Sequence, residues 1–218
     1  MGDEKVIQRY NDLIAKFGDS PKSLGWTKNR QKLRFKVLTE IFDMKNNHSV
    51  LDFGCGFGDM YQYLSDFYPG VNYYGVDINS KLIEMGKSKY PLAELWSKNI
   101  LESGLDCEYD FILSSGVHNV KCDNNQKFNK DTFELFYNHS KYGFAVNFLS
   151  TKVDYKSEDS FHSSPSEILD LAYSYTNRVM LRNDYMPFEF TIYVFKDDSF
   201  SKDDAVYSEY RSLLKDMI

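Results

Sequence analysis

Apolar side chains recur at helical spacing twice within the first 43 residues. The first stripe comprises Val6, Ile7, Tyr10, Leu13, Ile14 and Phe17. The segment 18–21 holds a glycine and a proline, which end this helix. A second stripe runs from about residue 28 to 43, at Leu33, Val37, Leu38, Ile41 and Phe42. The pattern therefore predicts two amphipathic helices ahead of the first strand.

From residue 49 onward, runs of strand-forming residues alternate with helical patterns. We expect strands at residues 49–53, 72–76, 92–97, 109–113, 142–149, 178–181 and 188–195. Helical spacing occurs at 60–68, 82–85, 133–137 and 166–175, and Asn79 or Ser80 can cap the second of these helices. Strands separated by helices favour βαβ units, so we predict a mostly parallel sheet covered by helices on both faces.

The C-terminal part of the chain departs from this alternation. Only residues 183–187 separate the last two predicted strands, which is too short for a crossover helix. These strands are therefore expected to pair as an antiparallel hairpin. Residues 203–218 predict a final amphipathic helix.

Charge and composition narrow the function. The net charge is −6, which argues against a nucleic-acid groove because such a groove needs clustered basic side chains. The three cysteines fit neither a disulfide framework nor a zinc site, and no metal-ligand cluster is visible, so no metal is expected. No signal segment or membrane-length apolar run occurs. We expect a cytoplasmic protein with reduced thiols and no membrane partner.

The segment with the most specific chemistry is the turn after the first predicted strand. Gly54, Gly56 and Gly58 allow the backbone to turn sharply and approach a ligand, and Asp77 ends the next strand. A carboxylate there can accept hydrogen bonds from a ribose, so the pair predicts a nucleoside-bearing ligand at the carboxyl ends of the strands. A dinucleotide is disfavoured, because its Gly-x-Gly-x-x-Gly spacing is absent and Asp52 would repel a pyrophosphate.

Four segments together resemble the class I S-adenosylmethionine-dependent methyltransferase superfamily. Residues 50–58 (VLDFGCGFG) resemble its first motif, and residues 74–78 (YGVDI) resemble its second. Residues 98–100 (KNI) take the place of the third motif, and residues 109–117 (YDFILSSGV) resemble the fourth. The resemblance covers roughly residues 48–148.

The resemblance implies a fold class and a division of the chain. We expect an α/β fold with a Rossmann-like, doubly wound, seven-stranded sheet, mostly parallel with an antiparallel C-terminal strand. Residues 1–218 would form one domain, in which N-terminal helices (1–47) form a lid over a core (48–218). S-adenosyl-L-methionine would be the cofactor.

The resemblance also implies roles for individual residues. The cofactor-binding set comprises Asp52, Gly54, Cys55, Gly56, Asp77, Ile78, Asn99, Ile100, Ser115 and Arg34. Within this set, Gly54, Gly56 and the backbone of Cys55 would approach the methionine part, and Asp52 would face its ammonium group. Asp77 would hold the ribose, Ile78, Asn99 and Ile100 would surround the adenine, and Ser115 would pass near the sulfonium. Arg34 is a candidate partner for the cofactor's carboxylate, or else lies on a solvated helix face.

The acceptor side is less specific. The fourth motif lacks the Asn/Asp-Pro-Pro-Tyr type of run, and His118 follows it instead. His118 is the leading candidate for a general base, since its ordinary pKa suits proton transfer; the alternative is a histidine that only holds the loop. Candidate substrate contacts are Asn119, Tyr155 and His162, with Asn147, Tyr185 and Glu189 as further possibilities.

Short substrate-binding segments and the lack of an extra domain favour a small-molecule acceptor over a protein or nucleic acid. The histidine favours O-methylation of a sugar or polysaccharide precursor. The alternatives are N-methylation of a small amine and a non-catalytic S-adenosylmethionine-binding protein. A nicotinamide-linked oxidoreductase is disfavoured by the glycine spacing. The sequence leaves the oligomeric state open.

Overall fold

The computed structural model describes residues 3–26, 28–196 and 210. Its centre is a seven-stranded sheet in the order β3-β2-β1-β4-β5-β7-β6. The strands are β1 (Ser49–Phe53), β2 (Asn72–Asp77), β3 (Glu94–Ser97), β4 (Tyr109–Ser114), β5 (Ser140–Leu149), β6 (Val179–Arg182) and β7 (Glu189–Phe195). Only β7 runs antiparallel to its neighbours, β5 and β6. The predicted sheet and its closing hairpin are thus confirmed.

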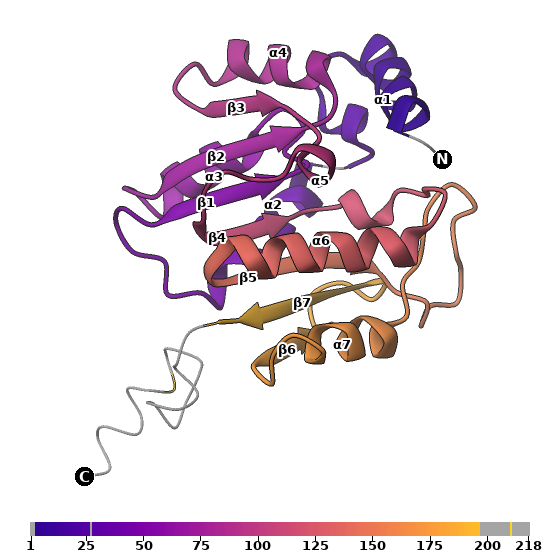
Figure 1. The fold of residues 1–218 in the computed structure, drawn as a ribbon. Helices are drawn as coiled ribbons and strands as arrows, with labels where there is room; N and C mark the ends of the chain where they lie inside the picture. The colour runs from indigo at the N-terminus through magenta and orange to yellow at the C-terminus, as the bar shows by residue number, and fades with distance from the viewer. Residues whose placement is uncertain (1–2, 27, 197–209, 211–218) are drawn as a thin grey trace.

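Helices pack on both faces of this sheet (Figure 1). They are α1 (Asp3–Phe17), α2 (Lys28–Glu40), α3 (Asp59–Phe67), α4 (Ser80–Lys89), α5 (Ile100–Ser103), α6 (Asn125–His139) and α7 (Pro165–Tyr173), with short 3₁₀ turns η1 (Pro21–Leu24) and η2 (Val117–Asn119). One buried apolar cluster joins α2, α3 and α4 to the sheet, and a second joins α6 and α7 to the other face. This is the two-sided burial that a mostly parallel sheet requires.

Local sequence signals explain several element boundaries. The side chain of Asn79 accepts hydrogen bonds from the amides of Lys81 and Leu82, which begins α4 as predicted. Pro165 occupies the first turn of α7, directly after the N-cap Ser164. Helix α2 ends at Glu40, three residues before the predicted end, although Ile41 and Phe42 beyond it remain buried. Except for Tyr210, the predicted C-terminal helix at 203–218 lies outside the described residues.

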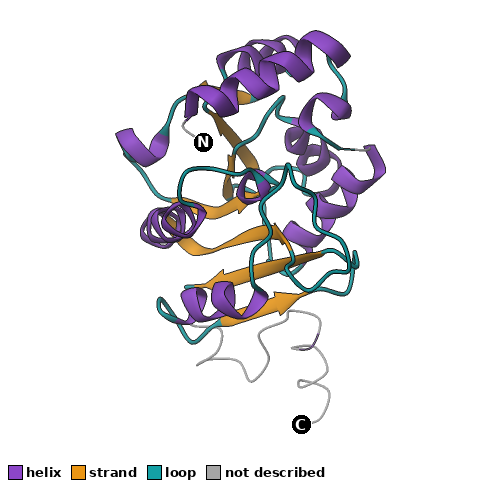
Figure 2. Ribbon diagram, turned by 90° about the vertical axis from the view of Figure 1, so that its right-hand side faces the viewer, coloured by secondary structure: helices purple, strands orange, loops and turns teal. Residues whose placement is uncertain are grey.

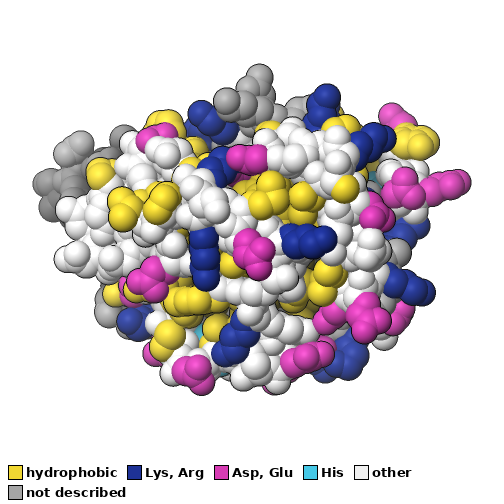
Figure 3. Space-filling view, turned by 90° about the horizontal axis from the view of Figure 1, so that it is seen from above, with side chains coloured by type: hydrophobic (Ala, Val, Ile, Leu, Met, Phe, Trp, Pro, Cys, Tyr) yellow, Lys and Arg dark blue, Asp and Glu magenta, His cyan; other side chains and the backbone are white. Residues whose placement is uncertain are grey.

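The carboxyl ends of the parallel strands all lie at one end of the sheet, here called its carboxyl edge. Figure 2 looks onto this edge, where the connecting loops gather. Helix α1 lies beside the same edge in Figure 1, so the N-terminal segment returns to the loops that follow β1, β2 and β3. Among the described helices, none has the length and apolar character needed to cross a bilayer. The face drawn in Figure 3 intersperses acidic and basic side chains without a continuous basic surface.

Candidate functional site

The turn after β1 is built from glycines in the left-handed region. The φ angles of Gly54, Gly56 and Gly58 are 72°, 58° and 77°, values that residues other than glycine rarely adopt. The amides of Gly54 and Cys55 both donate to the carbonyl of Val76, at 2.8 and 3.0 Å. These bonds fold the turn back onto the end of β2. The glycine spacing noted in the sequence therefore serves a conformation that the backbone adopts.

Asp77 ties the two strand ends together. One of its oxygens, Oδ2, accepts from the amide of Gly56 at 3.0 Å, and Oδ1 accepts from the amide of Asn79 at 2.8 Å. Burial raises the pKa of Asp77, and these backbone donors oppose the shift by favouring the charged form. Each carboxylate oxygen keeps further lone pairs, so Asp77 can still accept hydrogen bonds from a diol.

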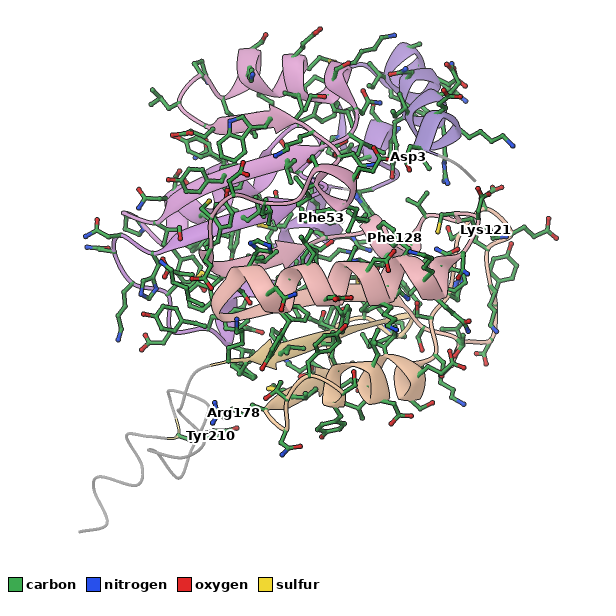
Figure 4. All side chains as sticks on the ribbon, viewed as in Figure 1. Asp3, Phe53, Lys121, Phe128, Arg178 and Tyr210 are labelled. Atoms are coloured by element: carbon green, nitrogen blue, oxygen red, sulfur yellow. The ribbon has the colours of Figure 1, made fainter. Side chains whose placement is uncertain are left out.

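A cavity opens at this point, between the strand ends and α1. It is lined from the core by Phe53, Gly54, Gly56, Val76, Asp77, Ile78, Asn79, Leu82, Lys98, Asn99, Leu101, Ser115, Gly116, Val117, Val120, Cys122 and Phe128. From the N-terminal segment it is lined by Asp3, Val6, Ile7, Tyr10, Leu24 and Trp26. Figure 4 labels three of these residues, Asp3, Phe53 and Phe128, which come from α1, β1 and α6 and lie on the same side of the molecule.

Polar contacts hold α1 over the cavity. The side-chain amide of Asn99 donates to Asp3 at 2.7 Å, and that of Asn79 donates to the carbonyl of Ile7 at 3.3 Å. Tyr10 of the same helix lines the cavity, and burial raises the pKa of its phenol to about 12, with the nearby Asp77 adding to the shift. The cavity is thus a space between two segments distant in sequence, rather than a pocket within the sheet alone.

Six of the predicted cofactor residues line this cavity. They are Gly54, Gly56, Asp77, Ile78, Asn99 and Ser115. They come from the ends of four neighbouring strands or the loops that follow them, which is why residues far apart in the sequence meet. The structure therefore brings together the glycine turn, the β2 carboxylate and the loop after β4.

Three other predicted cofactor residues lie behind the cavity wall. Asp52 is buried and accepts a hydrogen bond from the Tyr73 hydroxyl at 2.9 Å, and neither residue lines the cavity. Burial raises the pKa of Asp52 to about 7, against the effect of the Tyr73 bond. The side chains of Cys55 and Ile100 belong to the two apolar clusters, so neither lines the cavity. Their backbones alone remain near the turn and the start of α5.

Arg34 does not face the cavity either. Its guanidinium forms a buried ion pair with Glu189, at the start of β7. The Trp26 ring lies over this guanidinium, with 3.8 Å between its centroid and Cζ, and Trp26 itself lines the cavity. Arg34 is 2% exposed, so it does not lie on a solvated helix face either, and Trp26 separates its guanidinium from the cavity.

His118 is buried among aromatic rings instead of lining the cavity. Its Nδ1 lies 2.8 Å from Oδ1 of Asn129, and its ring packs against Phe128 and Phe148. Burial lowers its pKa to about 4, which the bond to Asn129 only partly offsets. A base needs to reach the acceptor's proton, and a side chain with no exposed surface here does not. The geometry favours the alternative role, that of holding the loop after β4.

Replacing His118 with alanine should therefore lower stability more than turnover. We expect a loss of about 1–3 kcal/mol in the free energy of unfolding, from the lost packing and the unpaired Asn129 oxygen. The folded pKa near 4 lies below the usual 6.5, so the wild type should lose stability as pH falls through that window. The variant should show a shallower loss. Urea unfolding between pH 4 and 7, with turnover per folded enzyme, tests this; lost turnover at unchanged stability would restore the catalytic role.

The candidate substrate contacts are dispersed. Oδ1 of Asn119 accepts from the amide of Leu149 at 2.7 Å, which joins the loop after β4 to the end of β5. Tyr155 is 80% exposed, and neither it nor His162 lines the cavity. Burial lowers the pKa of His162. The arrangement gives these residues no common ligand site.

Most of the apolar wall of the cavity was not predicted from the sequence. Val6, Ile7 and Tyr10 were recognised as one stripe of a helix, but nothing in the stripe indicates what it covers. Val120 and Phe128 carry no motif at all. Trp26 was assigned only to a segment that closes over the cofactor, and its position on Gly116 follows from packing.

A glycine turn, a strand-end carboxylate and a cavity at the carboxyl edge of the sheet form the arrangement of α/β proteins that bind nucleosides. The family model described as a methyltransferase domain matches residues 50–136. The chain is similar to "Putative methyltransferase Rv1506c" of Mycobacterium tuberculosis, with 26% identity over 163 residues that cover 72% of this chain and 98% of the relative.

Two further proteins extend the comparison. Malonyl-[acyl-carrier protein] O-methyltransferase of Acetivibrio thermocellus is 27% identical over 120 residues, which cover 54% of this chain and 41% of that relative. The crystal structure of magnesium protoporphyrin IX methyltransferase from Synechocystis PCC 6803 with bound SAM shares the fold, with a TM-score of 0.63 and 13% identity over 90% of this chain and 99% of that one. Residues 50–136 thus match a methyltransferase domain by sequence, and the chain shares its fold with a solved S-adenosylmethionine-bound methyltransferase.

Proposed function

We propose that this methyltransferase binds S-adenosylmethionine in the cavity between α1 and the strand ends and methylates an oxygen atom of a small acceptor. The observation that carries the proposal is the joint lining of this cavity by the Gly54–Gly56 turn and the carboxylate of Asp77. The sulfonium supplies an activated methyl group when the cofactor is bound. The protein's own task is then to bind, orient and exclude water.

The lining residues fit the parts of this cofactor. Gly56 has no side chain and lines the cavity beside Leu24, so a charged amino-acid group can approach its backbone from the cavity. Asp77 is suited to the ribose hydroxyls, since an ionised carboxylate makes strong hydrogen bonds to them. Ile78, Leu101 and Phe128 offer the apolar surface that an adenine ring needs. We therefore assign the methionine end to the turn and the adenine end to the region of α5 and α6.

Residues 3–26 act as the lid in this proposal, whereas α2, which the predicted lid of residues 1–47 also included, packs in the core. Helix α1 and Trp26 supply the outer wall of the cavity, whereas the core supplies its floor. The contacts of α1 with Asn79 and Asn99 are a few polar bonds, and none of its residues is fully buried. Such a lightly attached helix can open at a small cost in free energy, which lets the cofactor enter.

Oxygen is the proposed methyl acceptor for two reasons. One relative is itself an O-methyltransferase. A carboxylate oxygen is already anionic near neutral pH and needs no base, so the chemistry does not depend on the buried His118. A sugar hydroxyl, as the sequence favoured, would require another base. The net charge of −6 and the mixed charge of the face in Figure 3 favour a small acceptor over a nucleic acid.

Calorimetry and turnover together test the proposal. We expect S-adenosylhomocysteine to bind with 1:1 stoichiometry, and tritiated methyl groups to appear in product only when enzyme, S-adenosylmethionine and an acceptor are combined. Carboxylate, hydroxyl and amine acceptors of low molecular mass form the screen. Absence of calorimetric binding would overturn the cofactor assignment. Transfer confined to amines would overturn the choice of oxygen, and binding without any transfer would support a non-catalytic role.

A further inference from the structure

A second polar site lies on the side of Trp26 away from the cavity, between the carboxyl end of β5 and the start of β7. We propose that it binds a carboxylate group of the acceptor through Arg34. This proposal rests on the proposed function, since it assumes that the protein methylates an acceptor. The carboxylate anchored there is a recognition group, whether or not it is also the group that receives the methyl.

The hydrogen bonding of Arg34 leaves part of its guanidinium unused. Nε lies 3.1 and 2.9 Å from the two carboxylate oxygens of Glu189, and Nη2 also donates to Glu189. Nη1 has no partner among the described residues, although Arg34 is only 2% exposed. A buried N–H without a partner costs free energy, so a ligand atom that accepts a hydrogen bond from Nη1 would be favoured there. Glu189 occupies the edge of the planar guanidinium formed by Nε and Nη2, and the edge that includes Nη1 is left for another acceptor.

The local charge favours an anion on that open edge. Burial raises the pKa of Glu189, while Arg34 and then Arg30 lower it, so both guanidinium groups act on the one carboxylate. Phe188 precedes Glu189 in the chain, and Cζ of Arg30 lies over the Phe188 ring, 5.2 Å from its centroid. Tyr185, the other titratable group facing the pair, has its pKa raised by burial and stays neutral. Arg34 and Glu189 balance one another and the exposed Arg30 adds a positive charge nearby, and a planar carboxylate matches the guanidinium fork best.

The position of the site relative to the cavity fits an acceptor. The amide of Gly116, which lines the cavity, donates to Oδ1 of Asn147 on β5 at 2.7 Å. A Cβ placed on Gly116 would lie 2.4 Å from the Trp26 ring, so the ring packs directly on this glycine. Trp26 thus separates the proposed cofactor cavity from Arg34. A displacement of Trp26 would expose Arg34 to the cavity and allow an acceptor bound there to lie beside the proposed methyl position.

The fluorescence of Trp26 can report carboxylate binding at Arg34. The chain has two tryptophans, so the Trp96→Phe variant leaves Trp26 as the only indole fluorophore. With S-adenosylhomocysteine at saturation, we expect acetate, malonate and succinate to change its emission in a saturable manner. Malonamide and succinamide, which match the diacids in size but lack charge, should leave the emission unchanged. Equal responses to the acids and the amides would overturn the proposal.

Two further variants in the same background link the signal to Arg34. Glu189→Gln retains an acceptor for Arg34 and removes the competing negative charge, so carboxylates should bind at least several-fold more tightly. The double variant Arg34→Leu with Glu189→Leu replaces the pair by apolar groups, which proteins often tolerate, and should abolish the response. An unchanged carboxylate titration in the folded double variant would overturn the proposal.

The carboxylate of the cofactor itself is the rival ligand for Arg34. It is separated by comparing S-adenosylhomocysteine with 5′-methylthioadenosine, which lacks the amino-acid carboxylate. We expect the double variant to bind both compounds as the wild type does. A loss of affinity for S-adenosylhomocysteine alone would assign Arg34 to the cofactor and overturn the acceptor site. If the wild type binds neither nucleoside, the proposed function fails, and carboxylate titrations without nucleoside then test the Arg34 site separately.

Discussion

Replacing Asp77 with alanine should weaken the binding of S-adenosylhomocysteine by more than an order of magnitude. The carboxylate already accepts the amides of Gly56 and Asn79, at 3.0 and 2.8 Å, and has lone pairs left for the ribose. A hydrogen bond to a charged group contributes about 1.5–3 kcal/mol, so losing even one to the ribose corresponds to roughly a tenfold or larger change in Kd. The loss of order in the glycine turn adds to the effect. Calorimetry on the folded variant measures it.

The matched control is Asp110→Ala. Asp110 is also a strand carboxylate that accepts a backbone amide, that of Ser49 at 2.7 Å, but it does not line the cavity. We expect this control to lose stability while its affinity for S-adenosylhomocysteine stays within about twofold, a change of roughly 0.4 kcal/mol. Unchanged affinity in Asp77→Ala, or an equal loss in both variants, would contradict the assignment of Asp77 to the ribose.

Replacing Gly56 with valine should nearly abolish cofactor binding while the sheet stays folded. The φ angle of 58° at Gly56 is unfavourable for any side chain, with a cost of roughly 1–2 kcal/mol. A Cβ there would lie 3.1 Å from two carbons of Leu24, and the remaining atoms would enter the cavity that Gly56 lines. Overpacking costs about 1–3 kcal/mol, so we expect a loss of affinity of up to about 100-fold on calorimetry.

Gly104→Val provides the control for backbone strain alone. Gly104 has a φ of 73° and no atom within 4 Å of its would-be Cβ, and it does not line the cavity. Both variants should lower Tm, Gly104→Val through backbone strain alone and Gly56→Val through strain and the contact with Leu24, whereas only Gly56→Val should lose cofactor affinity. Retained binding in Gly56→Val would mean that the ligand does not approach the turn closely.

The sequence predicted the secondary structure well because its signals are local. Residues 49–53 were predicted as a strand and form β1 with the same bounds, and the hairpin of β6 and β7 follows from the short link between them. The helix at α5 was missed because its four residues are too few to show a period. The end of α2 was placed too late because Ile41 and Phe42 are buried without being helical.

The predicted cofactor residues that line the cavity are likewise those whose signals are local in the sequence. Gly54, Gly56 and Asp77 were found because a left-handed turn and a strand-end acid leave a mark at fixed positions in the chain. His118 and Arg34 were placed by residue type, and residue type does not say which way a side chain points. Glu189 is 155 residues from Arg34, and Asn129, 11 residues from His118, lies on the next helix, so packing of separate elements brings each pair together.

By itself, the sequence determined the alternation of strands and helices, the conformation of the glycine turn and the carboxylate at the end of β2, because each depends on residues within a few positions of one another. The tertiary structure alone decided that α1 and Trp26 close the cavity, that His118 is buried, and that Arg34 pairs with Glu189 behind the indole ring. These features depend on contacts between separate elements of the chain. Arg34 and Glu189, for example, are 155 residues apart. No local pattern records such a contact.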